Sequence, residues 1–158
     1  MSIRAAIAAA ALGLVCLVGC SGPNVDESIG PVADRTEWPK ILQEMVESTD
    51  LQDSDLEDIR VYCFGDFIDS AHMWQHHALP SLRETTITRL HLVPSDSNNQ
   101  EVQQVLQGVP DTWPAAAQSD DVEYYVRRPF KDGNDGSHCV LVHDKGKDLV
   151  TVWFLFVF

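Results

Sequence analysis

Histidines are the residues of this sequence whose type and spacing best fit metal or ligand binding. Zinc sites in proteins need three or four ligands that converge to within about 2.0–2.3 Å of the ion. His72 and His76 are four residues apart, so on a helix they would share one face and could chelate a metal. The chain has six histidines in all: His72, His76, His77, His91, His138 and His143.

The local structure of residues 71–79, AHMWQHHAL, decides whether this pair can meet. On a strand, His72, Trp74 and His76 lie on one face, but the two histidines are about 13 Å apart and cannot bind one ion. The preceding residues, GDFIDS, are typical of a turn, which favours a strand in a hairpin. We therefore expect His72, Trp74 and His76 to be a possible ligand-binding set, with His72 and His76 only weak candidates for a metal site.

Catalytic motifs are absent from the sequence. It contains no HExxH zinc motif, no GxSxG nucleophile elbow and no phosphate loop ending in GKS or GKT. A nucleophilic pair would require Cys63 or Cys139 to meet His138 or His143, which nothing in the spacing favours. We expect neither an enzyme nor a bound cofactor.

The first 19 residues have the layout of a secretory signal peptide. Arg4 supplies a positive charge, residues 5–18 form an apolar run of 14 residues, and the small Gly19 follows. The run is shorter than the roughly 20 residues that span a bilayer, so a retained transmembrane helix is not expected.

The end of this leader is more specific. Leu17-Val18-Gly19-Cys20 resembles the lipobox of bacterial lipoproteins. The resemblance implies that the Cys20 thiol is alkylated with diacylglycerol, that the leader is cut just before it, and that the new amino terminus is acylated. Ser21 is not the Asp that marks inner-membrane retention in many Gram-negative bacteria, which favours the outer membrane if the host has one. Two or three long acyl chains would hold the protein stably at a membrane.

The predicted cleavage removes Cys16 and leaves Cys63 and Cys139 as the cysteines of the folded part. Both lie in strand-like runs, VYCF and HCVL. Because exported proteins fold in an oxidising compartment, the two could form a disulfide. The alternative is that both are buried free thiols that act as small apolar residues.

The charge balance is strongly acidic. The whole chain has a net charge of −13, and the part from Cys20 onward holds 10 Lys and Arg residues against 24 Asp and Glu residues, a net charge of −14. Such a surface repels phosphate backbones, so no nucleic-acid partner is expected. The expected partner is a membrane, through the lipid at Cys20; a protein or small-molecule partner stays open.

Helices are predicted at three places. In Thr36–Ser48, the residues Trp38, Ile41, Leu42, Met45 and Val46 recur with helical spacing. A second helix begins at Pro80 and is expected to end at Pro94. A third is capped by Asn98 or Asn99 and stopped by Gly108.

Strands are predicted from β-branched and aromatic content. They cover residues 59–64, 71–79 and 122–128, and the last 21 residues read as a hairpin around the turn His-Asp-Lys-Gly-Lys. The final run is apolar at nearly every position from Leu149, which predicts a central strand covered on both faces.

These features predict an α+β fold with an antiparallel sheet of about five strands and two or three helices packed on it as a two-layer sandwich. The expected organisation is a signal peptide at 1–19, a lipidated flexible tether at 20–35 and one domain at 36–158. We expect a lipid-anchored protein of the cell envelope whose domain is a non-enzymatic binding or structural accessory. The alternatives are a metal- or small-ligand-binding protein that uses the histidines, and an enzyme with an unrecognised site.

Overall fold

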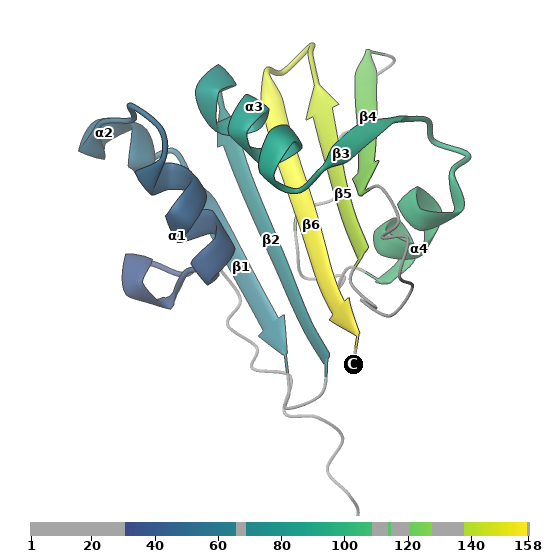
Figure 1. The fold of residues 1–158 in the computed structure, drawn as a ribbon, viewed down its shortest axis with the longest axis horizontal. Helices are drawn as coiled ribbons and strands as arrows, with labels where there is room; N and C mark the ends of the chain where they lie inside the picture. The colour runs from purple at the N-terminus through teal and green to yellow at the C-terminus, as the bar shows by residue number, and fades with distance from the viewer. Residues whose placement is uncertain (1–30, 66–68, 109–113, 115–120, 128–137, 158) are drawn as a thin grey trace, which may run out of the picture.

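Six strands form one open antiparallel sheet in the computed structural model, which describes residues 31–65, 69–108, 114, 121–127 and 138–157 (Figure 1). The strand order is β1-β2-β6-β5-β4-β3. The strands are β1 (Arg60–Gly65), β2 (Asp69–His77), β3 (Leu92–Ser95), β4 (Val122–Arg127), β5 (His138–Asp144) and β6 (Leu149–Val157). The predicted α+β class with an antiparallel sheet is confirmed. The leader, Cys16 and Cys20 lie outside the described residues.

The C-terminal strand β6 lies inside the sheet, where it pairs with β2 on one side and β5 on the other. Val150, Val152 and Phe154 face one side of the sheet, while Trp153 faces the other, and all four are at most 3% exposed. The continuous apolar run at the end of the chain is therefore explained by coverage of both faces.

Helices and one short 3-10 turn connect the strands. They are η1 (Arg35–Glu37), α1 (Lys40–Glu47), α2 (Asp53–Leu56), α3 (Pro80–Arg89) and α4 (Gln100–Gly108). None of the helices in the described part of the chain combines the length and apolar character needed to cross a membrane.

The predicted helix over 36–48 is divided in two at Trp38 and Pro39. A residue that precedes proline avoids helical backbone angles, and Trp38 is extended, with ψ of 151°. Asp34, rather than Thr36, caps the first turn, because its carboxylate accepts a hydrogen bond of 2.9 Å from the Thr36 N–H.

The short strand β3 was not predicted from the sequence, where the helix from Pro80 was expected to continue to Pro94. The helix instead ends at Arg89, and His91 adopts a left-handed conformation with φ of 53°. The chain then turns back to pair with β4, with Pro94 opposite Tyr125. Pro94 is tolerated because β3 is an edge strand, where an outward-facing position needs no N–H donor.

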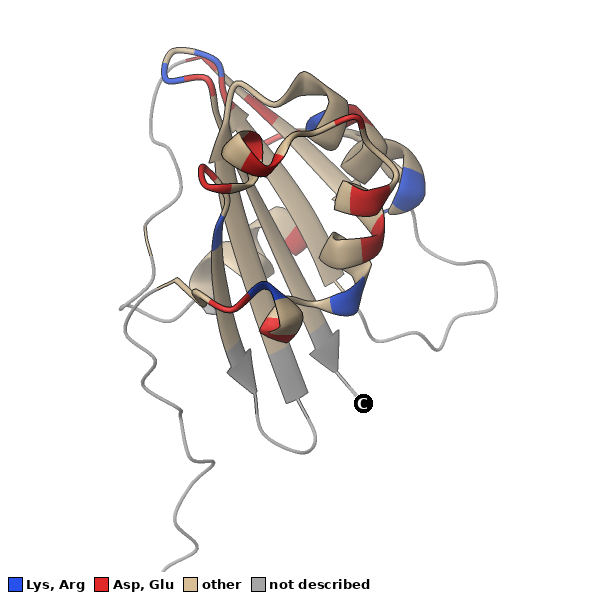
Figure 2. Ribbon diagram, turned by 90° about the vertical axis from the view of Figure 1, so that its left-hand side faces the viewer, with Lys and Arg blue, Asp and Glu red and all other residues tan. Residues whose placement is uncertain are grey.

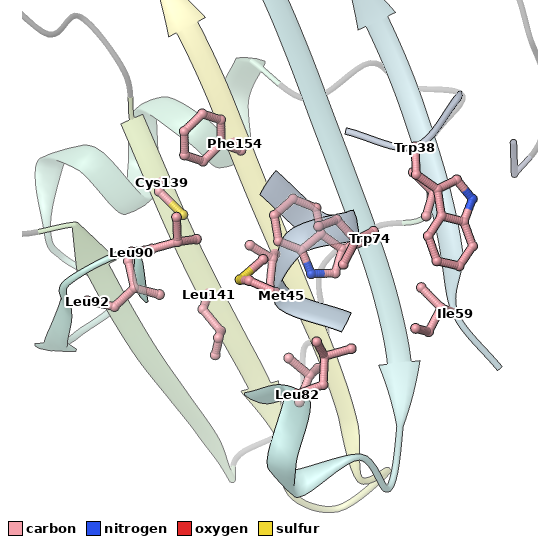
Figure 3. Packing of buried hydrophobic residues seen from close by; sticks show 14 residues of the cluster. Trp38, Met45, Ile59, Trp74, Leu82, Leu90, Leu92, Cys139, Leu141 and Phe154 are labelled. Carbon is pink, nitrogen blue, oxygen red and sulfur yellow. The ribbon is translucent and has the colours of Figure 1, made fainter. Parts of the chain in front are cut away.

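The main core lies between the sheet and the helices α1 and α3. Leu42 and Met45 of α1 and Leu82 of α3 are fully buried against Trp74 of β2. Figure 3 shows the Trp74 ring near the centre of this cluster, with Met45 beside it. Full burial of a side chain of this size contributes about 1.5–3 kcal/mol, so this cluster is a main source of stability.

The opposite face of the sheet carries the helix α4. Val102 and Val105 of α4 pack with Met73, Val140 and Trp153 in a second cluster. Helices therefore contact both faces of the sheet, α1 and α3 on one and α4 on the other. As predicted, Asn99 caps α4, accepting a hydrogen bond of 2.8 Å from the Glu101 N–H.

Charged residues are concentrated outside the strands. In Figure 2, acidic residues in red are spread over the helices and connections, whereas the strands are mostly tan. The segment before η1 also contacts the sheet: the Val32 N–H donates a hydrogen bond of 2.6 Å to the Val61 carbonyl at the edge of β1. The chain thus joins the domain at residues that the sequence placed in the tether.

Candidate functional site

The strand β2 carries the three residues that the sequence singled out. His72, Trp74 and His76 point to the face of the sheet that α1 and α3 cover, as the predicted strand alternation requires. Trp74 is 0% exposed and His76 is 1% exposed, while His72 is partly buried. The three side chains therefore do not form an open binding surface, and Trp74 is a core residue.

The strand conformation also decides the metal hypothesis for this pair. Four residues along a strand separate His72 from His76 by about 13 Å, which is far beyond the reach of a shared ion. No group of three or more His, Cys, Asp or Glu residues converges as a metal site within the described ranges. His72 and His76 are thus excluded as ligands of the same metal.

The two cysteines do not form the disulfide that the sequence allowed. Cys63 on β1 and Cys139 on β5 are both free thiols. The strands β2 and β6 lie between them, so their Cα atoms are about 14 Å apart, whereas a disulfide needs about 4.4–6.8 Å. Of the two alternatives that the sequence left open, the structure has the free thiols, with Cys139 buried and Cys63 half-buried.

Neither thiol is activated as a nucleophile. Burial, with a smaller contribution from the Glu37 carboxylate, raises the pKa of Cys63 to about 11. Cys139 is 0% exposed, and burial also raises its pKa strongly. Reactive cysteines require a lowered pKa, so this environment disfavours thiolate chemistry at both positions.

A polar cluster lies at the end of the sheet where α3 begins, around the buried His143 of β5. An Nη1 atom of Arg83 on α3 lies 3.1 Å from His143 Nδ1. Because a guanidinium only donates hydrogen bonds, Nδ1 is the acceptor here and the ring proton of the neutral tautomer is assigned to Nε2. Asp148 lies 3.7 Å from Nε2, so the imidazole is held between a cation and a carboxylate.

Glu123 on β4 connects His143 with the protein surface. Its carboxylate lies 3.5 Å from His143 Nδ1 and 2.9 Å from Lys145 Nζ. It also accepts a hydrogen bond of 3.4 Å from the Tyr125 hydroxyl. The hydrogen bond from Lys145 is the main reason why the pKa of Glu123 lies below its usual value, while burial raises the pKa of Tyr125.

His76 lies in the same row of the sheet as His143, with Val150 between them. Neither nitrogen of the His76 ring has a hydrogen-bond partner among the described residues. Burial lowers the pKa of His76 to about 4, and the nearby Arg83 and His143 add to this, while Asp58 opposes it. The imidazole is therefore neutral at pH 7.

Two pockets lie near the β1 edge of the sheet. The smaller, of about 130 Å³, is bordered by His76 and by residues at the adjoining ends of β1, β2 and β6. The larger, of about 300 Å³, lies between residues 31–38 and residues 56–60. Only the smaller pocket contacts one of the residues that the sequence identified as a candidate.

Sequence reasoning did not identify the charged residues near these two histidines. Arg83 is 60 residues from His143 in the chain, and Asp58 is 18 residues from His76. The local sequence around Arg83 and Asp58 does not indicate these contacts. They depend on how distant elements are placed by the strand register, which the sequence does not show. The sequence singled out His143 as one of six histidines and as a possible partner of a nucleophilic cysteine, but not as a partner of Arg83.

No known protein family matches this chain, and neither do the curated proteins or the solved structures with which it was compared.

Proposed function

We propose that this chain is the precursor of a lipid-anchored envelope protein. The observation that carries the proposal is the tetrapeptide Leu17-Val18-Gly19-Cys20 at the end of an apolar run that begins after Arg4. A thiol at the cleavage point is what the lipidation chemistry requires. In a host with an outer membrane, Ser21 favours that membrane, because a retention signal would place Asp at this position.

The experiment uses Cys16, inside the leader, and Cys20, at the cleavage point, as a matched pair. The full chain and its Cys16→Ala and Cys20→Ala variants are expressed in a bacterium that processes lipoproteins, with labelled palmitate supplied. The wild type and Cys16→Ala are expected to begin at Cys20 and to carry the mass of a diacylglycerol and an acyl chain. Cys20→Ala is expected to incorporate no palmitate. An unmodified Cys20 at the mature terminus of the wild type would exclude lipid anchoring.

We propose further that the domain is a non-enzymatic binding or structural accessory module. Two observations support this. The thiols of Cys63 and Cys139 have raised pKa values, and the neutral His76 and Trp74 are enclosed in the core. Cys63 and Cys139, the candidate nucleophiles of the sequence, are therefore poorly suited to catalysis.

A second candidate function, binding of a small ligand at the histidine end of the sheet, is favoured by one specific observation. His76 and His77 border a pocket of about 130 Å³ together with the charged residues Asp58 and Arg60. Titration of candidate small molecules against the histidine ring resonances tests this function.

A further inference from the structure

His143 lies at the centre of the polar cluster at the end of the sheet where α3 begins. Its side chain is 8% exposed, and the strand register places Glu123 of β4 directly opposite it. Charged or titratable groups face the ring from each element packed around it, namely Arg83 of α3, Glu123 of β4, Asp148 of the β5–β6 turn and His76 of β2. Neither of the proposed functions uses this cluster.

The position of Asp148 is fixed by its backbone. The residue has a left-handed conformation with φ of 50°, which Asp adopts more readily than most residues. Its carbonyl accepts a hydrogen bond of 3.3 Å from the Ala78 N–H, and its own N–H donates one of 3.4 Å to the Lys145 carbonyl. These bonds tie the β5–β6 turn to the connection between β2 and α3, so the fold itself places the Asp148 carboxylate beside the ring.

Arg83 holds the neutral ring. Its Nη1 atom lies 3.1 Å from His143 Nδ1, and this contact is a hydrogen bond only while Nδ1 carries no proton, because a guanidinium cannot accept. Glu123 Oε2 lies 3.5 Å from the same Nδ1, and Asp148 Oδ1 lies 3.7 Å from Nε2. Both carboxylates are thus just outside the distance of about 2.7–2.9 Å that is typical of a charge-assisted hydrogen bond.

A proton on Nδ1 reverses these preferences. The ring becomes a cation with two donors, so Arg83 loses its acceptor and is repelled, while both carboxylates are attracted. Each carboxylate reaches hydrogen-bond distance by a movement of about 1 Å or less. Histidine is the side chain that ordinarily changes its charge between about pH 5 and 8, so mild acid is enough to cause the exchange. The proton comes from solvent, which reaches the cluster at Glu123, whose side chain is 40% exposed.

The other neighbours of the cluster are compatible with this exchange. Lys145 Nζ contacts Oε1 of Glu123 at 2.9 Å, which leaves Oε2 for the ring and for the Tyr125 hydroxyl. Burial lowers the pKa of His76 to about 4, so His76 stays neutral in mild acid and does not repel a charged His143.

We propose that His143 is a pH-sensitive switch whose ring changes partners when it is protonated. At neutral pH the ring accepts a hydrogen bond from Arg83 and ties the first turn of α3 to β5. In mild acid it releases Arg83 and donates to Glu123 and Asp148, which ties the β5–β6 turn to β4 instead. The helix α3 keeps its core contacts through its buried residues, so the released Arg83 guanidinium is the group that the switch presents to a partner.

The test follows both side chains by NMR in the mature full chain, purified in detergent, as the pH is lowered from about 8 to about 5. Long-range proton–nitrogen spectra report the protonation of each ring nitrogen, and the His143→Gln and Arg83→Lys variants assign the signals. At the start, Nε2 is expected to carry the only ring proton. As Nδ1 gains a proton, the Arg83 side-chain signals are expected to shift with the same midpoint.

Charge-removing variants test the exchange of partners. Glu123→Gln and Asp148→Asn should each lower the midpoint of the His143 titration by about 0.5 pH unit or more, and Arg83→Met should raise it by a similar amount. Asn tolerates the left-handed conformation, so Asp148→Asn retains the turn. As a control, Asp53→Asn removes a carboxylate that is 97% exposed on α2 and should leave the midpoint unchanged.

Four results would each overturn the switch. The first is a neutral ring with its proton on Nδ1, and the second is a set of Arg83 signals that stays constant while His143 titrates. The third is a midpoint that Glu123→Gln and Asp148→Asn change no more than Asp53→Asn does. The fourth is a ring that stays neutral down to the pH at which the domain unfolds.

Discussion

Cys63 and Cys139 lie in one row across the sheet, with His72 of β2 and Phe154 of β6 between them. All four side chains point to the face that α1 and α3 cover. The row explains why the two cysteines stay unpaired in this fold: strand order, not distance along the chain, keeps the sulfur atoms apart.

Thiol reactivity provides the first prediction. At pH 8 under native conditions, iodoacetamide is expected to leave Cys139 unmodified, because it is 0% exposed. Cys63 should react slowly, since a pKa of about 11 instead of 9.0 gives about 100-fold less thiolate at this pH. In denaturant without reductant, mass spectrometry should find both residues alkylated. Recovery of a peptide pair linked through Cys63 and Cys139 would contradict the strand order.

The packing of α1 on the sheet provides the second prediction. Met45 is 0% exposed in the main cluster, so Met45→Ala should lower the free energy of unfolding by about 2–5 kcal/mol. Glu47, two residues further along the helix, is exposed, and Glu47→Ala should change it by no more than about 0.5 kcal/mol. Urea denaturation followed by circular dichroism measures both. Similar losses for the two variants would mean that α1 does not pack by its Met45 face.

Local patterns were enough to predict most elements of this fold. The alternation of β2, the apolar run of β6 and the cap at Asn99 each depend on residues close in sequence, and the structure confirms each of them. β3 was missed because its existence depends on a left-handed turn at His91 and on pairing with β4. Pro94 reads as a helix stop, and only the edge position makes it compatible with a strand.

The candidate site was less predictable for a related reason. The sequence identified His76 as notable, but its neighbours come from strand register: Arg60 and Asp58 reach the pocket because β1 begins where β2 ends. For the same reason the sequence left the pairing of Cys63 and Cys139 open, since two strand-like runs with one cysteine each say nothing about which strands lie between them. The periodicity of apolar residues predicts which face of a helix or strand is buried, but it does not predict which other element packs or pairs beside it.

The contact between Arg83 and His143 provides the third prediction. Arg83→Ala removes the donor 3.1 Å from His143 Nδ1 and should cost about 1–3 kcal/mol, because the buried acceptor loses its partner. Arg83→Lys, which retains a donor, should cost less.

A double-mutant cycle measures this coupling. If the contact matters, Arg83→Ala should cost much less in a His143→Phe background than in the wild type. Equal costs in the two backgrounds, measured by urea denaturation at pH 7, would mean that Arg83 acts through its other neighbours.

The burial of neutral His76 provides the last prediction, a loss of stability in mild acid. The pKa of His76 is about 4 in the folded protein and 6.5 in the unfolded chain, so between these values the unfolded state binds more protons. The free energy of unfolding is therefore expected to be constant with respect to this group above about pH 6.5 and to fall as the pH decreases toward 4. The full loss is about 3 kcal/mol for a shift of this size. His72, whose pKa is also lowered by burial, adds a loss in the same direction.

A comparison of His76 and His77 variants tests whether His76 causes this dependence of stability on pH. His76→Gln should flatten the dependence on pH between 6.5 and 4, whereas His77→Gln, at an exposed position on the other face of β2, should change it much less, because burial and not His77 is the main cause of the lowered pKa of His76. Urea denaturation at half-unit pH steps provides the measurement. A His76→Gln slope as steep as that of the wild type would show that other groups dominate the acid response. Because the variant also removes the unsatisfied imidazole, the comparison must use the slope with pH and not the stability at any one pH.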